Sequence, residues 1–88
     1  MASYNILFKP SVEKDFSSLP KSILQRVIAR IDSLAESPYP AGSMKLSGAE
    51  KLYRLRAGEY RIIYEVDAKA KKITVHYVRH RREVYRRL

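Results

Sequence analysis

The feature that most constrains the fold is a stretch of alternating apolar and polar residues at 52–66, which reads LYRLRAGEYRIIYEV. Two runs rich in Tyr, Leu, Ile and Val are separated by Ala57-Gly58-Glu59, and glycine adopts the positive φ that tight hairpin turns need. The stretch therefore predicts a β-hairpin. Because side chains alternate between the two faces of a strand, Arg54 and Arg56 share one face of its first strand.

The position of the hairpin turn decides which arginine lies opposite Arg61. A turn at Ala57-Gly58 pairs Arg61 with Arg54. A turn at Gly58-Glu59 pairs it with Arg56, and only a three-residue loop with a bulge avoids both pairs. Like charges directly opposite each other destabilise a sheet by roughly a few tenths of a kcal/mol or more. Either the arginine face binds an anion, or the long arginine stems cover apolar surface and hold their charged ends in water.

The residues before the hairpin predict one strand and two helices. Tyr4 to Lys9 alternates weakly and predicts a short strand, which Pro10 ends. Ser11 to Leu19 predicts a short helix. From Lys21 to about Glu36 apolar residues recur at three- and four-residue spacing, which indicates an amphipathic helix packed on the sheet. Its apolar stripe comprises Ile23, Leu24, Val27, Ile28, Ile31, Leu34 and Ala35.

The remaining segments complete an α+β fold in one small domain, residues 1–88. Ser37 to Gly48 predicts a loop that leads into the hairpin. Asp67 to Lys72 predicts a turn, and Ile73 to Arg79 a third strand of an antiparallel meander. For residues 80–88 a short helical turn and an ordered tail both remain open. We expect the helices on one face of the sheet and a polar, arginine-bearing face free to meet a ligand.

The distribution of charge points to a polyanionic partner. Thirteen of the eighteen Lys and Arg residues lie in residues 45–88, and the whole chain has a net charge of +9. A basic half on a small domain is typical of proteins that bind nucleic acid. A supercharged surface and a patch for an acidic protein are the alternatives.

Composition excludes several other classes of protein. The chain has no cysteine, which excludes disulfides and thiolate metal sites and fits a reducing cytoplasm. No apolar run reaches the roughly 18 residues of a membrane span, and the first residues lack a signal peptide, so we predict a soluble, cytoplasmic protein. His76 and His80 have no carboxylate pattern around them, and no glycine-rich loop opens a helix. We therefore predict no metal, nucleotide or other cofactor.

The basic and aromatic residues suit RNA chemistry. Metal-free RNA cleavage needs a group that takes the 2′-hydroxyl proton, cations that stabilise the phosphate, and an acid for the departing 5′-oxygen. Arginine suits the second role because its planar, permanently charged fork matches phosphate oxygens. Tyr and His transfer protons, and Tyr rings stack on bases. The candidates are Arg54, Arg56, Arg61, His80, Arg81 and Tyr85. These residue types alone favour a module that only binds RNA.

Four stretches carry a family pattern: FKPSVEKDFSSLP, KLSG, LYRLRAGEYRIIYEV and ITVHYVRHRREVY. They resemble the RelE/ParE superfamily of small bacterial toxins, and most closely its RelE branch of ribosome-dependent mRNA endonucleases. The resemblance implies that Arg61 stabilises the scissile phosphate and that Arg81 aids the leaving group. It also implies that Tyr85 stacks on the message and helps to activate the 2′-hydroxyl. His80 stands where some relatives have Lys, so His80 and Tyr85 are both candidates for the base.

Further basic residues are candidates for binding the RNA backbone: Arg54, Arg56, Lys51 and Arg79. Arg79 stands where relatives often have Gly before the His-Arg pair. Each assignment has a structural alternative, in which Arg61 is a surface residue paired with Glu59 or Glu65, and Tyr85 anchors the tail on the sheet. The remaining tyrosines near the hairpin are assigned to the core or to sheet packing; they are Tyr53, Tyr60, Tyr64 and Tyr77.

The resemblance also implies a reaction and a set of partners. A RelE-type toxin enters the A site of the small ribosomal subunit and cuts mRNA by 2′-hydroxyl attack, which inhibits translation. Its cognate antitoxin is a RelB-like, partly disordered chain that wraps the toxin along the long helix and the sheet edge. The toxin–antitoxin complex binds promoter DNA, and no membrane is involved. The alternatives are a ParE-type inhibitor of DNA gyrase without nuclease activity, and a non-catalytic, basic RNA-binding module.

Overall fold

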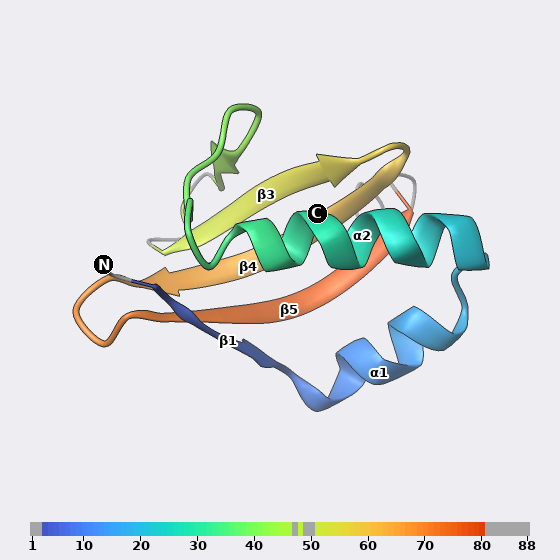
Figure 1. Ribbon diagram of the computed structural model, residues 1–88, viewed down its shortest axis with the longest axis horizontal. Coiled ribbons are helices and arrows are strands. Elements are labelled where there is room, and N and C mark those ends of the chain that lie inside the picture. The colour runs from blue at the N-terminus through green and yellow to red at the C-terminus, as the bar shows by residue number, and fades with distance from the viewer. Residues whose placement is uncertain (1–2, 47, 49–50, 81–88) are drawn as a thin grey trace.

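The computed structural model of the protein describes residues 3–46, 48 and 51–80. Within them the elements are β1 (Asn5–Phe8), α1 (Pro10–Ser17), α2 (Lys21–Ser33), β2 (Met44–Lys45), β3 (Leu52–Ala57), β4 (Tyr60–Asp67) and β5 (Lys72–His80). The strands of this described part form one sheet in the order β1-β5-β4-β3-β2. Both helices lie on one face of this sheet (Figure 1). The predicted order of a strand, two helices and a three-strand meander is confirmed.

The hairpin at the centre of the sheet has one of the two predicted registers. Arg56 pairs with Arg61 and Ala57 with Tyr60, so Gly58 and Glu59 form the turn. Gly58 has a φ of 64°, in the left-handed region where glycine carries no steric cost. Strand β5 continues the antiparallel meander, and β1 adds to the far side of β5 in parallel.

The core lies between the helices and the sheet. It consists of Val12, Val27, Ile31, Leu34, Leu55, Ala57, Ile62, Tyr64, Val66, Ile73, Val75 and Val78. From the predicted apolar stripe of α2, Val27 and Ile31 are buried, but Ile28 is 41% exposed. The prediction is wrong for Ile28 because successive helical residues are turned by about 100°, which places Ile28 at the margin of the face that buries Val27.

The structure corrects the predicted loop from Ser37 to Gly48. Met44 and Lys45 form β2, which pairs with Arg54 and Tyr53 at the edge of β3. A strand of two residues cannot show an alternating pattern, so only its pairing with β3 defines it. Neither helix of the described part has the length and apolar character needed to cross a membrane.

Candidate functional site

Three arginines from adjacent strands lie side by side on the face of the sheet opposite the helices. Arg56 pairs with Arg61, and Arg61 pairs with Arg79. The neighbouring residues Ile62 and Val78 belong to the core, so the arginines point away from the helices. Directly paired residues have Cβ atoms roughly 4.5–5.5 Å apart. We call these three residues the arginine row. The predicted stacking of arginines across the hairpin is confirmed, and β5 extends it by Arg79.

The centre of the arginine row is shielded from water. Arg61 is only 3% exposed and Ile63 on the same strand only 1%, whereas Arg56 is exposed. The prediction that this whole face is free to meet a ligand is therefore wrong at its centre. The alternative of Arg61 as a surface residue is wrong for the same reason: β4 lies between β3 and β5, whose long side chains flank Arg61. Glu65, one predicted partner, lies 3.0 Å from His76 Nε2.

Burial changes how the central guanidinium acts. Its charge persists because arginine stays protonated in proteins. In surroundings that contain little water, the attraction between a guanidinium and a phosphate is stronger than in bulk solvent. The arginine row therefore combines an exposed arginine that an anion can reach first, Arg56, with a shielded one that can interact more strongly, Arg61.

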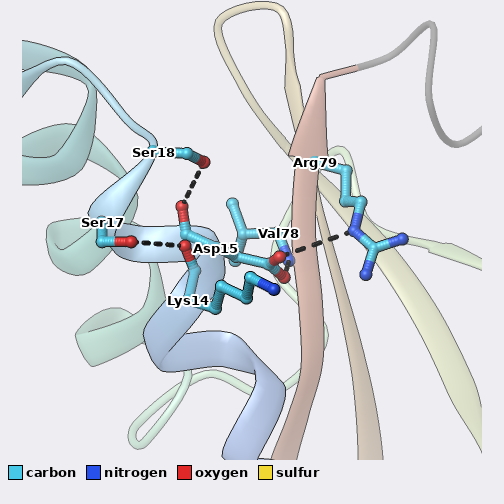
Figure 2. A network of polar contacts seen from close by, with 6 residues as sticks. All are labelled: Lys14, Asp15, Ser17, Ser18, Val78 and Arg79. Atoms are coloured by element: carbon cyan, nitrogen blue, oxygen red, sulfur yellow. Dashed lines mark hydrogen bonds and ion pairs between the residues drawn. The ribbon is translucent and has the colours of Figure 1, made fainter.

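The other end of the arginine row is held by α1. Arg79 Nε lies 3.6 Å from Asp15 Oδ1, and the second carboxylate oxygen accepts a hydrogen bond of 3.0 Å from the Val78 amide (Figure 2). The Arg79 guanidinium also lies 4.9 Å from the ring centroid of Tyr77. Because β1 pairs with β5 only as far as Val75, Asp15 satisfies an amide on the edge of β5 that β1 does not reach. Asp15 thus orients Arg79 and offsets part of its charge.

The C-terminal turn of α1 places Asp15 for this role. The hydroxyls of Ser17 and Ser18 donate hydrogen bonds of 2.8 Å to the carbonyl oxygens of Lys14 and Asp15 (Figure 2). The Asp15 side chain is 13% exposed, so its contact with Arg79 is largely shielded from solvent. Asp15 was not predicted as a site residue, because no local sequence signal indicates a contact across more than sixty residues.

Arg54 lies beside the arginine row, opposite Ile63. Its Nη2 contacts Met44 Sδ at 2.9 Å, and its Nε is buried without a hydrogen-bond partner. Leaving a buried donor unsatisfied costs roughly 1–3 kcal/mol. Arg54 is therefore positioned by β2 on the same face as Arg61, with a donor that the fold does not use.

Two other predicted site residues, His80 and Lys51, lie apart from the arginine row. His80 pairs with Tyr60, and their rings meet edge to face with centroids 5.3 Å apart. By strand alternation His80 lies on the helix-bearing face, opposite to Arg61. Lys51 is exposed just before β3, at the end of that strand away from the hairpin turn. Arg81 and Tyr85 lie outside the described residues.

A second basic group lies where α2 passes the hairpin turn. Arg30 Nε donates a hydrogen bond of 3.2 Å to the carbonyl oxygen of Arg56. Arg26 Nη1 lies 3.6 Å from the position of a Cβ built on Gly58. Both arginines line a hollow of about 560 Å³ together with Arg56. The sequence did not indicate this proximity, because it depends on how α2 packs beside the hairpin.

The described residues show no site for a metal ion. No group of three or more His, Cys, Asp or Glu side chains in this part of the chain is arranged to hold one. The described side chains on the face opposite the helices include the arginine row, Tyr77 and the Glu65–His76 pair.

Comparison with known proteins identifies relatives of this chain. A family model described as "ParE toxin of type II toxin-antitoxin system, parDE" matches residues 6–85. A RelE1 protein of Methanocaldococcus jannaschii is 32% identical over 66 residues, which cover 72% of this chain and 73% of that protein. Toxin RelG of Mycobacterium tuberculosis is 27% identical over 85 residues, 96% of this chain and 98% of that toxin.

Solved structures share the fold. A chain of the archaeal RelE–RelB complex from Pyrococcus horikoshii OT3 matches with a TM-score of 0.80 and 34% sequence identity. The match covers 90% of this chain and 96% of that one.

Proposed function

The chain belongs to the RelE/ParE superfamily of toxins from type II toxin–antitoxin systems, and we propose that it is a RelE-type endoribonuclease. In this proposal it cleaves mRNA in the ribosomal A site and so inhibits translation. The arginine row is the observation that carries the proposal. It sets the shielded Arg61 between two other guanidinium groups, an arrangement suited to a phosphate whose charge grows in the transition state.

The proposed reaction is a metal-independent phosphoryl transfer. The 2′-oxygen forms a bond to phosphorus while the bond from phosphorus to the 5′-oxygen breaks. The products are a 2′,3′-cyclic phosphate and a 5′-hydroxyl. The ribosome would hold the message in the geometry of attack, and such positioning supplies much of the rate enhancement.

Roles are assigned by position and by resemblance. Arg61 stabilises the charge on the phosphate, and Arg56 and Arg54 bind the backbone beside it. Resemblance assigns Arg81 to the leaving group. Resemblance makes both Tyr85 and His80 candidates for proton transfer. We prefer Tyr85, because His80 packs on Tyr60 on the opposite face of the sheet from Arg61.

The proposed partners are the ribosome, mRNA and an antitoxin. The matched structure from Pyrococcus horikoshii is that of a complex of RelE with RelB. By analogy we propose that a RelB-like antitoxin wraps this toxin, and that the complex binds its own promoter DNA. The net charge of +9 favours both an acidic antitoxin segment and nucleic acid.

The test is primer extension on a message in a purified translation system. Wild-type protein should create new 3′ ends within A-site codons, and only when ribosomes are present. Arg61→Ala should reduce cleavage by about 10²–10³-fold, the loss typical for removing one donor to a transition-state oxyanion. Arg61→Lys should fall between the two, because an ammonium keeps the charge and lacks the planar fork. Lys21→Ala, an exposed lysine on α2, serves as the control and should cleave normally.

The same experiment distinguishes the proposed nuclease from a second candidate function, inhibition of DNA gyrase. The matching family model describes ParE toxins, which favours a gyrase inhibitor as the alternative. Intact messages in the presence of folded wild-type protein would refute the nuclease. Loss of DNA supercoiling by gyrase in a parallel assay would then support the ParE-type function. If both assays are negative, only the RNA-binding module remains.

A further inference from the structure

A basic and aromatic hollow lies at the end of the sheet away from the hairpin turn. Four segments meet there: the connection from α2 to β2, β2 itself, the start of β3, and the turn from β4 to β5 (Figure 1). The hollow has a volume of about 410 Å³. Its polar and aromatic lining residues are Tyr39, Lys45, Lys51, Tyr53, Asp67 and Lys69.

Tyr39 presents a fixed, half-exposed ring to this hollow. The side chain is 50% exposed, and its centroid lies 5.1 Å from that of Tyr53. Tyr53 in turn stacks on the buried Tyr64, with centroids 5.8 Å apart and an interplanar angle of 26°. The Tyr64 hydroxyl donates a hydrogen bond of 2.8 Å to the carbonyl oxygen of Pro38. This bond ties the segment that carries Tyr39 to the core.

The charge around the hollow is mainly positive. Lys45, Lys51 and Lys69 are all exposed, and within the described residues none of them forms an ion pair with a carboxylate. The hollow also contains one carboxylate, Asp67. Its Oδ1 accepts a hydrogen bond of 3.1 Å from the amide of Ala70. Part of the hydrogen-bonding capacity of this carboxylate is therefore used to stabilise the turn from β4 to β5.

We propose that this hollow binds single-stranded RNA, with one base stacked on Tyr39 and the flanking phosphates among the three lysines. An exposed aromatic ring accepts any base on its face, and lysines beside it bind the backbone. The volume falls within the roughly 300–1,000 Å³ usual for small-ligand pockets. The choice of RNA rests on the proposed function, but binding here does not require cleavage.

This site is separate from the arginine row. Tyr53 and Arg56 lie on β3 three residues apart, so their side chains point to opposite faces and their backbones are about 10 Å apart. The hollow would therefore hold a different part of the RNA from the part that meets Arg61. It adds affinity and orientation without contact with the scissile phosphate.

Fluorescence anisotropy with a short, fluorescein-labelled oligoadenylate tests stacking on Tyr39 without ribosomes. Tyr39→Ala should weaken binding about tenfold, within the range for losing one base–aromatic stack. Tyr39→Phe should bind within about twofold of the wild type, because the ring is kept. Phe8→Ala is the matched control, since Phe8 is 49% exposed and is distant from the three lysines. Circular dichroism establishes that each variant is folded.

The salt dependence of RNA binding tests whether the lysines of the hollow contact phosphates. For single-stranded nucleic acid the slope of log K against log salt falls by about 0.7 for each phosphate contact removed. The pair Lys45→Gln and Lys69→Gln should therefore reduce the slope by about 1.4. The pair Lys14→Gln and Lys21→Gln removes the same charge from exposed positions on the helices and should leave the slope unchanged.

The outcomes distinguish this site from the nuclease. Equal binding by Tyr39→Ala and the wild type would overturn the proposed site, as would equal slopes for the two lysine pairs. So would equal affinity for a polyglutamate of matched charge, which offers no base to stack. If ribosome-dependent cleavage persists in that case, the proposed function survives alone. If Tyr39→Ala weakens binding while messages stay intact with ribosomes, the RNA site stands and the nuclease falls.

Discussion

Arg61 and Tyr64 lie three positions apart on β4 and show two ways in which a polar side chain can be buried. Arg61 points away from the helices, is 3% exposed and keeps its charge there. Tyr64 points into the core, is 0% exposed and is held as a neutral phenol. Burial raises the pKa of Tyr64 to about 12. Arg61 is thereby suited to bind an anion. Tyr64 makes the stability of the fold depend on pH in the alkaline range.

The pKa of Tyr64 predicts a loss of stability at high pH. A phenol whose pKa is raised by folding contributes fully below pH 10.0, the ordinary value, and loses that contribution as the pH rises toward about 12. We expect the free energy of unfolding to fall by roughly 3 kcal/mol over this range through Tyr64. Tyr64→Phe should be less stable at neutral pH, because Pro38 loses its donor, yet should lose less between these two pH values. Urea unfolding at both values measures the difference, and an equal fall in both proteins would contradict it.

At the scale of elements, turn geometry sets how the strands meet. The two-residue turn at Gly58 and Glu59 brings Arg56 opposite Arg61, and a shift of the turn by one residue would pair Arg61 with Arg54 instead. The turn from β4 to β5 contains Lys71 at a φ of 55°, a conformation that is uncommon for residues other than glycine. Lys71 Nζ lies 5.0 Å from the ring centroid of Tyr4, a contact that offsets part of this strain.

The positive φ of Gly58 predicts that replacing this residue lowers the stability of the protein. Gly58→Ala should lower the free energy of unfolding by about 1–2 kcal/mol, the strain of a left-handed residue with a Cβ. A clash does not contribute, because the added Cβ would lie 3.6 Å from Arg26 Nη1, which is ordinary contact. Gly58→Asn should cost less, since asparagine tolerates this region. Chemical denaturation of the three proteins measures the order, and equal stability of glycine and alanine would refute the argument.

At the scale of the whole molecule, charge acts across the entire structure. The net charge is +9, and the molecule extends 34 × 29 × 25 Å. The screening length is about 30 Å at 0.01 M salt and about 8 Å at 0.15 M. In dilute salt every cation therefore repels nearly every other one, whereas at 0.15 M only neighbouring side chains interact. Polyanions relieve the same repulsion, which favours binding of RNA and of an acidic partner.

This repulsion predicts opposite effects of salt on folding and on RNA binding. Raising salt from 0.01 to 0.15 M should raise Tm by roughly 4–8 °C, corresponding to about 1 kcal/mol of relieved repulsion. RNA affinity should fall over the same range. Thermal unfolding followed by circular dichroism measures the first effect. The double substitution Lys14→Glu and Lys21→Glu lowers the net charge of +9 by four and should shrink the gain in Tm. A fall in Tm with salt would show that ion pairs outweigh the repulsion.

Local patterns were sufficient to predict most of the elements. The hairpin followed from alternation and a glycine turn, and the long helix followed from its apolar spacing, because both signals lie within neighbouring residues. The cross-strand pairing of Arg61 with another arginine followed from counting residues on either side of a two-residue turn. The two-residue strand at Met44 was too short to carry any pattern and was missed.

The sequence by itself determined the α+β order of elements, the basic second half and the family to which the chain belongs. Only the tertiary structure decided that Arg61 is shielded, that Asp15 reaches Arg79, and that His80 lies on the other face of the sheet. It also decided that the ring of Tyr39 lines one hollow with lysines from three separate segments. The physical reason is that burial and contacts between distant residues depend on how whole elements pack, whereas alternation and turn chemistry depend only on neighbours.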